Sequence, residues 1–254
     1  MTNQLTLSGK VALVTGASRG IGRAIARGYA AAGAAVGCAA RDEAGLASLV
    51  AEIEAAGGRA VALPTDVTDE KAVNRMVTGA VDAFGGLDIL VANAGVNLSR
   101  ADVADSDTAT WEETIAVNLF GVYYCIKAAI PHLKARGAGK IITVGSGLGH
   151  NGIPGLSAYA CSKAALWMLT QVVAQELAGE AISVNELIPG PVNTTIGSDD
   201  IGDAAGDSFS QNVLAKNKEW VKLPADVVPL ALFLATQPDI GPTAQSFNLM
   251  RRAR

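Results

Sequence analysis

Three side chains in the middle of the sequence are of the types that can move a proton together. Tyr159 and Lys163 are four residues apart in a stretch with a helical pattern, so their side chains lie on one helix face, about one turn apart. Ser146 stands thirteen residues before Tyr159, at the end of a predicted strand. An ammonium group beside a phenol favours the phenolate, so we expect Lys163 to lower the pKa of Tyr159 from its usual value of about 10. Such a tyrosine can exchange a proton with a substrate oxygen that Ser146 holds. A Tyr–Lys pair at this spacing is also common on solvated helix faces, so other motifs must support the interpretation.

A glycine-rich turn lies near the start of the sequence, where residues 15–22 read TGASRGIG. Glycines at a strand-to-helix turn let the backbone approach a pyrophosphate, and the free N–H groups of the following helix favour an anion. The spacing is G-x-x-x-G-x-G. The dinucleotide fingerprint G-x-G-x-x-G is not met because position 25 is Ile, and no Gly-Lys-Ser/Thr follows as in a P-loop. We predict an anion-binding turn made of Gly16, Ser18, Arg19, Gly20, Ile21 and Gly22.

The same turn also matches a hydrolase motif. Residues 16–20 satisfy G-x-S-x-G, the nucleophile elbow of α/β-hydrolases, with Ser18 as the nucleophile. A hydrolase needs an oxyanion loop from an earlier strand, and only 15 residues precede Gly16. Its general base would have to be His132 or His150, the two histidines of the chain. This alternative, which we disfavour, predicts dependence on Ser18 and no need for a nucleotide.

The elements that must position these residues alternate regularly along the chain. The pattern predicts strands at 11–15, 34–39, 59–64, 87–92, 140–145, 181–188 and 246–249, and helices at 20–32, 42–56, 70–84, 110–135, 157–177 and 225–235. Strands separated by helices imply right-handed βαβ crossovers and a parallel sheet covered on both faces. We predict one α/β domain over residues 1–254, a doubly wound (Rossmann) sheet whose carboxyl edge binds the ligand.

One segment departs from this alternation. Residues 197–218 are rich in Gly, Asp, Ser and Asn. They form either a surface loop with a short helix or a mobile substrate lid. We favour the lid because the segment follows a strand end, where ligands bind in open α/β sheets.

Composition excludes several classes of protein. Half of the 254 residues are hydrophobic, which is enough for a large core and excludes a disordered chain. The 20 Lys+Arg against 24 Asp+Glu give a net charge of −4, opposite in sign to the charge of most nucleic-acid-binding proteins. Cys38, Cys125 and Cys161 form no C-x-x-C pattern, and no apolar leader opens the sequence, so we expect a cytoplasmic protein without disulfides. The apolar residues 24–40 are interrupted by Arg27, so we predict no membrane span, and we predict no metal site.

Taken together, the motifs resemble those of the short-chain dehydrogenase/reductase family, in its compact single-domain form. The resemblance covers nearly the whole chain. Within the family, the sequence resembles 3-oxoacyl carrier-protein reductases and sugar and polyol dehydrogenases. Each motif is weak alone, but all occur in the family's order and spacing. The matching residues are the turn at 15–22, Asp66-Val67, Asn93-Ala94-Gly95, Asn118, Ser146, Tyr159-x-x-x-Lys163 and Pro189-Gly190.

The resemblance implies roles for these residues. Tyr159 is the general acid in carbonyl reduction, Ser146 binds the carbonyl oxygen, and Lys163 holds the nicotinamide ribose and lowers the pKa of the tyrosine. Asn118 positions a water that links Lys163 to solvent; without the family, a helix-interior Asn bonding locally would be the default interpretation. The chemistry implied is hydride transfer between a nicotinamide and a carbonyl or alcohol carbon. Further cofactor contacts are implied for Asp66 and Val67 near the adenine, Asn93, Ala94 and Gly95 after the fourth strand, and Pro189, Gly190, Val192 and Thr194 around the nicotinamide.

The end of the second strand favours NADP over NAD. An NAD enzyme of this architecture usually has an acidic residue there, which bonds the ribose 2′-OH. This chain has Ala40 followed by Arg41, and Arg41 together with Arg19 can pair with a 2′-phosphate. Asp42 and Glu43 come after Arg41 and suit the first turn of the next helix, where the dipole stabilises them.

Three further points stay open in the sequence. A dinucleotide-binding sensor or scaffold that turns nothing over is the alternative to an enzyme, although a pure binder needs no proton relay. The substrate is a small carbonyl or alcohol compound, with sugars, polyols, ketones and 3-oxoacyl groups all open; His150 and Asn151 either bond a polar substrate or form a plain loop turn. The aromatic run Phe120, Tyr123 and Tyr124, with Trp167 and Met168, is either core or an interface, and by resemblance we favour a homotetramer.

The sequence departs from the family near its C-terminus. The Thr-Gly-Gln and Asp-Gly-Gly segments common there are absent, and residues 243–245 read Thr-Ala-Gln.

Overall fold

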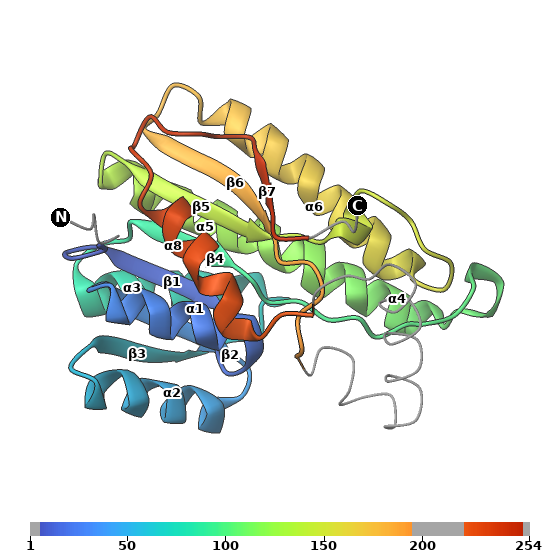
Figure 1. Ribbon diagram of the computed structural model, residues 1–254, viewed down its shortest axis with the longest axis horizontal. Coiled ribbons are helices and arrows are strands. Elements are labelled where there is room, and N and C mark those ends of the chain that lie inside the picture. Colours follow the sequence, from blue (N-terminus) through green and yellow to red (C-terminus); the bar gives the residue numbers. More distant parts are fainter. Residues whose placement is uncertain (1–5, 195–220, 251–254) are drawn as a thin grey trace.

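The computed structural model describes residues 6–194 and 221–250, and these form a parallel sheet covered by helices on both faces (Figure 1). The strand order within this part of the chain is β3-β2-β1-β4-β5-β6-β7, and every neighbouring pair is parallel. This confirms the doubly wound α/β prediction. The substrate lid predicted for residues 197–218 lies outside the described residues. The strands are β1 Val11–Thr15, β2 Ala35–Ala40, β3 Arg59–Pro64, β4 Ile89–Ala92, β5 Gly139–Val144, β6 Ile182–Ile188 and β7 Ser246–Asn248.

Two hydrophobic layers hold the helices to the sheet. One core contains Ile25 of α1, Leu49 of α2 and Leu234 of α8, and the other contains Met76 of α3 and Leu166 of α6. The strands β1, β4, β5 and β6 are buried along their whole length, as expected of parallel strands that helices cover on both faces. The helices are α1 Gly20–Ala31, α2 Glu43–Ala55, α3 Glu70–Phe84, α4 Thr108–Ile115, α5 Gly121–Ala135, α6 Ser157–Glu176 and α8 Val228–Ala235.

The long helix predicted for residues 110–135 is interrupted. A π-helical turn, Ala116–Phe120, separates α4 from α5. The whole stretch Thr108–Ala135 is long and apolar enough to pass a length-and-composition test for a membrane span. Its apolar residues Val122, Ile126 and Leu133 nevertheless lie in the hydrophobic core, and a core helix of a soluble protein passes the same test.

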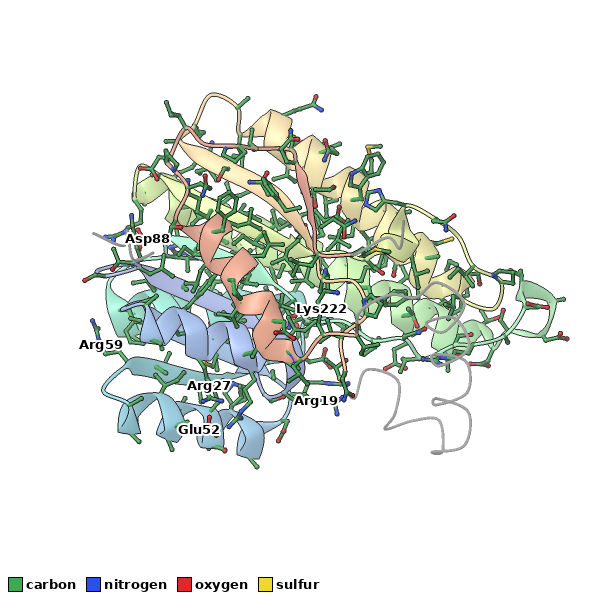
Figure 2. The ribbon with its side chains drawn as sticks, in the orientation of Figure 1. Arg19, Arg27, Glu52, Arg59, Asp88 and Lys222 are labelled. Carbon is green, nitrogen blue, oxygen red and sulfur yellow. The ribbon has the colours of Figure 1, made fainter. Side chains whose placement is uncertain are left out.

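Polar contacts fasten the ends of the sheet away from the carboxyl edge. The Asp88 carboxylate accepts a hydrogen bond from the Val11 backbone N–H at 2.8 Å and pairs with the Arg136 guanidinium at 3.2 Å. Asp88 lies at the end of the molecule opposite Arg19 and Lys222 (Figure 2). On one face, the buried Tyr29 hydroxyl of α1 donates to the Ala231 carbonyl of α8 at 2.8 Å. These bonds leave the opposite, carboxyl edge of the sheet free to carry a site.

Candidate active site

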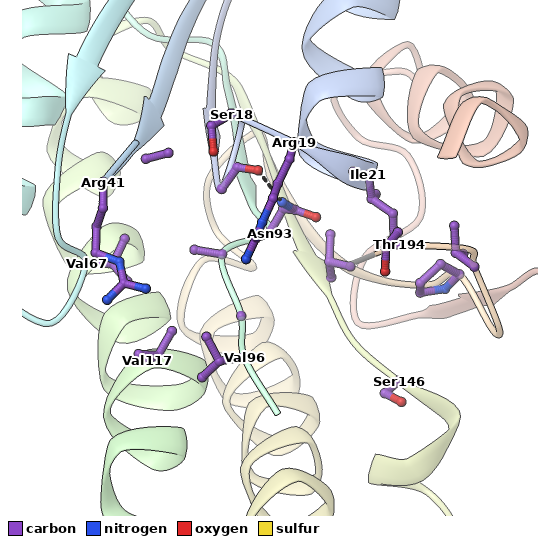
Figure 3. Close-up of a pocket in the computed structure, with 18 of the residues that line it drawn as sticks. Ser18, Arg19, Ile21, Arg41, Val67, Asn93, Val96, Val117, Ser146 and Thr194 are labelled. Atoms are coloured by element: carbon purple, nitrogen blue, oxygen red, sulfur yellow. Dashed lines mark hydrogen bonds between the residues drawn. The ribbon is translucent and has the colours of Figure 1, made fainter. Parts of the chain in front are cut away.

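The predicted site residues gather around one pocket at the carboxyl ends of β1, β2, β4, β5 and β6. Its volume is about 660 Å³, within the usual range for cofactor and ligand sites. Arg41 and Val67 lie at one end of it and Ser146 at the other, with Arg19 and Asn93 between them (Figure 3). Of the predicted residues, Gly22 and Asn118 are not in the described pocket wall. Those that line it are Gly16, Ser18, Arg19, Gly20, Ile21, Arg41, Asp66, Val67, Asn93, Ala94, Gly95, Ser146, Tyr159, Lys163, Pro189, Gly190, Val192 and Thr194.

The glycine turn has little room for side chains. Gly16 and Gly20 have φ angles of +66° and +57°, which L-residues with a Cβ adopt only under strain. Gly22 lies behind the turn rather than in the pocket wall, and a Cβ there would overlap the Gly16 carbonyl oxygen and lie 2.5 Å from Asn93 Nδ2. Gly22 therefore serves the close packing of the turn rather than direct contact with a ligand.

The start of α1 is suited to an anion. Among the described helices, α2 is capped by the Asp42 carboxylate, which accepts from the Gly45 N–H at 3.0 Å. Helix α1, whose N-cap residue is Arg19, has no side-chain cap and no acidic residue in its first turn. Gly20 and Ile21, the first two residues of α1, line the pocket, so the N-terminal end of this helix lies at it. A helix start with free donors, positive dipole and no competing carboxylate fits the pyrophosphate of a dinucleotide.

One threonine joins the turn after β1 to the turn after β4. The Thr15 hydroxyl accepts hydrogen bonds from the backbone N–H groups of Asn93 at 3.0 Å and of Ala94 at 3.1 Å. In return, the Asn93 amide donates to the Thr15 carbonyl at 2.8 Å. These bonds explain why Asn93 lies against the glycine turn, and they fix the two backbone segments that border the centre of the pocket.

The pocket end near β2 carries the residues that bear on cofactor preference. Ala40, Arg41 and Asp42 all line it. Asp42 is the N-cap of α2 and Glu43 lies in that helix's first turn, as we predicted from their order after Arg41. Asp66 is engaged locally, because its Oδ1 accepts from the Thr68 N–H at 2.9 Å and from the Thr68 hydroxyl at 2.8 Å.

The other end of the pocket brings together Ser146, Tyr159 and Lys163. Ser146 follows β5, and the other two side chains come from the first two turns of α6. The Lys163 ammonium donates to the Val144 carbonyl at 2.9 Å and lies 5.8 Å from the centre of the Tyr159 ring. The Ser146 hydroxyl accepts from the Leu148 N–H at 3.2 Å. A carbonyl oxygen placed between the serine and tyrosine hydroxyls would therefore meet two donors.

The pKa values in this cluster are set mainly by burial. Burial lowers the pKa of Lys163 to about 8, and the charge of Glu186 opposes that shift. Burial raises the pKa of Tyr159, and the hydrogen bond with Ser146 opposes that shift. The pKa of Tyr159 is thus raised rather than lowered as we expected, because the loss of water around the phenol outweighs the hydrogen bond with Ser146.

Asn118 is buried below the pocket, in the π turn between α4 and α5. Its Oδ1 accepts from the Val96 N–H at 2.8 Å, and its amide donates to the Val96 carbonyl at 2.9 Å and to the Ser162 hydroxyl at 3.0 Å. The side chain therefore bonds to a distant loop rather than to its own helix. π turns often occur at functional positions, but the proton-relay role of Asn118 stays a prediction.

Several residues of the pocket wall carry no chemical motif. Most of them flank the predicted positions at strand ends, and Val117 precedes Asn118 in the π turn, so this closeness is the sequence feature by which they could have been found. They are Ala40, Asp42, Thr65, Val96, Val117, Val144 and Gly145. Among residues 6–194 and 221–250, no group of three or more His, Cys, Asp or Glu side chains could hold a metal ion.

Comparison with known proteins identifies the class. Residues 10–203 match the family model described as short chain dehydrogenase. The chain is 36% identical over 230 residues to 2,5-dichloro-2,5-cyclohexadiene-1,4-diol dehydrogenase of Sphingobium indicum, covering 91% of this chain and 90% of that protein. It is 36% identical over 232 residues to 3β-hydroxysteroid dehydrogenase 1 of Eggerthella lenta, covering 91% and 88%. A solved structure described as an NAD(P)-dependent gluconate 5-dehydrogenase of Beutenbergia cavernae with bound NADP is similar with a TM-score of 0.86, at 34% identity over 97% of both chains.

The chain belongs to the short-chain dehydrogenase/reductase family. It is an NAD(P)-dependent oxidoreductase of that family, so the hydrolase alternative is set aside. Ser18, the nucleophile of that alternative, lies in the glycine turn that lines the dinucleotide pocket.

Proposed function

We propose that this protein interconverts a secondary alcohol and a ketone, prefers NADP(H), and uses Tyr159 as the general acid and base. The observation that carries the proposal is that Ser146, Tyr159 and Lys163 open on the same pocket as the glycine turn and Arg41. When bound, the nicotinamide supplies or accepts the hydride. Every other step falls to side chains of this chain.

In the direction of reduction, the two hydroxyls orient the carbonyl oxygen and Tyr159 donates its proton to it. The raised pKa of Tyr159 keeps the phenol protonated, which suits a proton donor. Lys163 lies behind the phenol with its ammonium on the Val144 carbonyl, so its positive charge favours the phenolate that forms as the proton leaves. Its lowered pKa allows it to pass a proton on near neutral pH.

The experiment is nicotinamide absorbance with NADPH and NADH, in both directions, for wild type and Tyr159→Phe. We expect turnover by wild type, and a loss of turnover in Tyr159→Phe with cofactor binding retained, since the phenol is the proton donor. Equal turnover in both would refute the role of Tyr159. Tight cofactor binding without turnover of any substrate by wild type would instead favour the sensor or scaffold.

The preference for NADP rests on Ala40 and Arg41 at the end of β2. A 2′-phosphate fits beside a guanidinium, and no acidic side chain follows β2 before Asp42, whose carboxylate is used as a helix cap. The double variant Ala40→Asp, Arg41→Ala should reverse the preference for NADPH over NADH in kcat/KM. An unchanged ratio would contradict the assignment.

For the substrate we propose a carbocyclic secondary alcohol or the corresponding ketone. Two of the similar proteins are named for hydroxyl groups on carbon rings, a cyclohexadienediol and a steroid. The described pocket wall also contains the apolar side chains of Val96, Val117 and Val192. The test panel contains a cyclohexanediol, a 3β-hydroxysteroid and gluconate, and higher kcat/KM for gluconate than for either ring would overturn this choice.

We further propose that residues 1–254 form a single domain and that the chain assembles as a homotetramer in the cytoplasm. Phe120, Tyr123 and Met168 are 49%, 43% and 51% exposed, whereas Tyr124 packs partly against the core. Exposed aromatic and thioether side chains on neighbouring helices favour an interface. Light scattering after gel filtration measures the assembly, and cell fractionation measures the location.

A further inference from the structure

A glutamate is buried in the sheet directly behind the catalytic cluster. Glu186 belongs to β6. This strand lies between β5 and β7 and alongside α6 (Figure 1). The side chain of Glu186 is wholly buried. Its carboxylate packs on Gly145, where a Cβ would overlap Oε1. Gly145 immediately precedes Ser146. Burying a carboxylate is costly unless it is paired, so its partners indicate what it serves.

Two side chains hold the same oxygen of this carboxylate. Glu186 Oε2 lies 3.0 Å from His150 Nε2 and accepts from the Ser246 hydroxyl at 2.5 Å, whereas Oε1 has no hydrogen-bond partner among the described residues. Ser246 belongs to β7, on the far side of β6 from the pocket strands. His150 belongs to the segment that carries Ser146. The carboxylate thus ties that segment to β6, the strand next to the edge strand β7.

A single short turn connects His150 to Ser146. The 3₁₀ turn η3, Gly147–Gly149, begins at the serine and ends at the histidine. The Gly149 N–H donates to the Ser146 carbonyl at 3.0 Å, and the His150 N–H donates to the Gly147 carbonyl at 3.1 Å. Any shift of the histidine is therefore transmitted to the serine through two backbone hydrogen bonds.

The imidazole of His150 is fixed on two sides. Besides the bond from Nε2 to Glu186, its ring meets the Trp167 ring of α6 edge-on, with centroids 5.2 Å apart. His150 is not among the described residues that line the pocket, and 33% of its side chain is exposed at the surface. It is therefore placed to hold the turn rather than to contact the reacting atoms.

We propose that Glu186 and His150 form a positioning pair for the reaction, in which the buried carboxylate holds the imidazole and the imidazole holds the turn that sets the Ser146 hydroxyl. This inference rests on the proposed function of Ser146. A displacement of the hydroxyl by even a fraction of an ångström weakens its bond to the carbonyl oxygen in the transition state more than the binding of cofactor.

Four proteins test the pair: wild type, His150→Leu, His150→Gln and Ser246→Ala. Leucine removes the bond to Glu186. Glutamine restores it, because its amide nitrogen is as many bonds from Cα as Nε2 of histidine and can donate to Oε2, but it cannot act as an acid or base near neutral pH. Ser246→Ala removes the other bond to the same oxygen without touching the turn, and so is the matched control.

The first measurement is hydrogen–deuterium exchange of the peptide that covers residues 146–151, which needs no substrate. We expect faster exchange in His150→Leu and unchanged exchange in His150→Gln and Ser246→Ala. The second is kcat and KM with the panel alcohol of highest turnover. We expect kcat to fall about 10-fold or more in His150→Leu, and to stay within about twofold in the other two variants, with the NADPH dissociation constant unchanged in all.

Each other outcome overturns the pair. If exchange and kcat in His150→Leu both equal those of wild type, the turn holds Ser146 without the imidazole of His150. Equal loss of kcat in His150→Gln and His150→Leu would show that the histidine acts by its own proton. If wild type turns nothing over, the proposed function fails, while the exchange measurement still decides whether the pair holds the turn.

Discussion

The titration of Lys163 gives a test of the site that needs no substrate. In the unfolded chain its ammonium loses a proton at a pKa near 10.5, whereas in the folded protein burial lowers that pKa to about 8. Between these values the unfolded chain binds more protons than the folded one, so the free energy of unfolding rises with pH. The shift corresponds to about 3 kcal/mol at 1.36 kcal/mol per pKa unit. Below pH 8 the folded protein bears the full cost of a buried ammonium.

The perturbation is Lys163→Met, which removes the titrating group and keeps an unbranched side chain. The assay is urea unfolding followed by tryptophan fluorescence, at fixed protein concentration, at intervals through and above the pH window. We expect the stability of wild type relative to Lys163→Met to rise by about 3 kcal/mol from just below pH 8 to pH 10.5. The raised pKa of Tyr159 contributes stability that is lost above the phenol's unfolded pKa, but this loss is common to both proteins.

Parallel stability curves would refute the reasoning, because they would mean that Lys163 keeps an ordinary pKa and is not buried as described. Glu186→Gln is a second variant, which keeps Lys163 and changes only the charge near it. Loss of the carboxylate removes the charge that raises the pKa of Lys163, so the rise in stability should begin at lower pH than in wild type.

Three further variants test the scaffold around the site. Gly22→Ala should weaken NADPH binding and cost about 1–3 kcal/mol of stability, because its Cβ would lie 2.5 Å from Asn93 Nδ2. Isothermal titration measures the binding and urea unfolding measures the stability. Unchanged binding would contradict the packing role of Gly22. Asp88→Ala should cost about 2 kcal/mol by leaving the Val11 N–H without its acceptor, with kcat unchanged because the bond lies at the opposite end of the sheet; a fall in kcat at full folding would refute this. Tyr29→Phe should lower stability by about 1 kcal/mol through loss of its bond to α8, and no change in the urea midpoint would contradict it.

Much of this fold could be predicted from the order of its apolar runs. Strands β1 and β3 and helix α3 have the predicted ends, because glycine, proline and aspartate mark their boundaries in the sequence. The interruption at Ala116–Phe120 could not be predicted from periodicity. Asn118, in the middle of this turn, makes two amide hydrogen bonds to Val96. These bonds form only when the loop after β4 is in place, 22 residues away in the chain.

In the site, too, the sequence predicts the position of a residue better than its environment. The spacing of Tyr159 and Lys163 places both on one face of α6 and in the wall of one pocket, as predicted. The direction of the tyrosine pKa shift was wrong, because a sequence shows neighbouring charges but not the water that burial removes. The bond between His150 and Glu186 joins residues 36 apart on different elements, and no local pattern points to it.

The hydrogen bonds of Thr15 lie at a boundary between two parts of the protein, one that bears on cofactor preference and one that carries the proposed chemistry. The described pocket residues that bear on cofactor preference all precede residue 68, and those that carry the proposed chemistry all follow residue 92. The two parts meet where β1 pairs with β4, and at the edge of that pairing the Thr15 hydroxyl accepts from the Asn93 and Ala94 backbones. Both of those donors are main-chain groups, and the Asn93 amide donates back to the Thr15 carbonyl, so the junction uses the side chains of Thr15 and Asn93. A chimera that takes its first three strands from a relative should therefore carry that relative's cofactor preference, provided that Thr15 and the bonds of Val11 with Asp88 and of Tyr29 with Ala231 are kept.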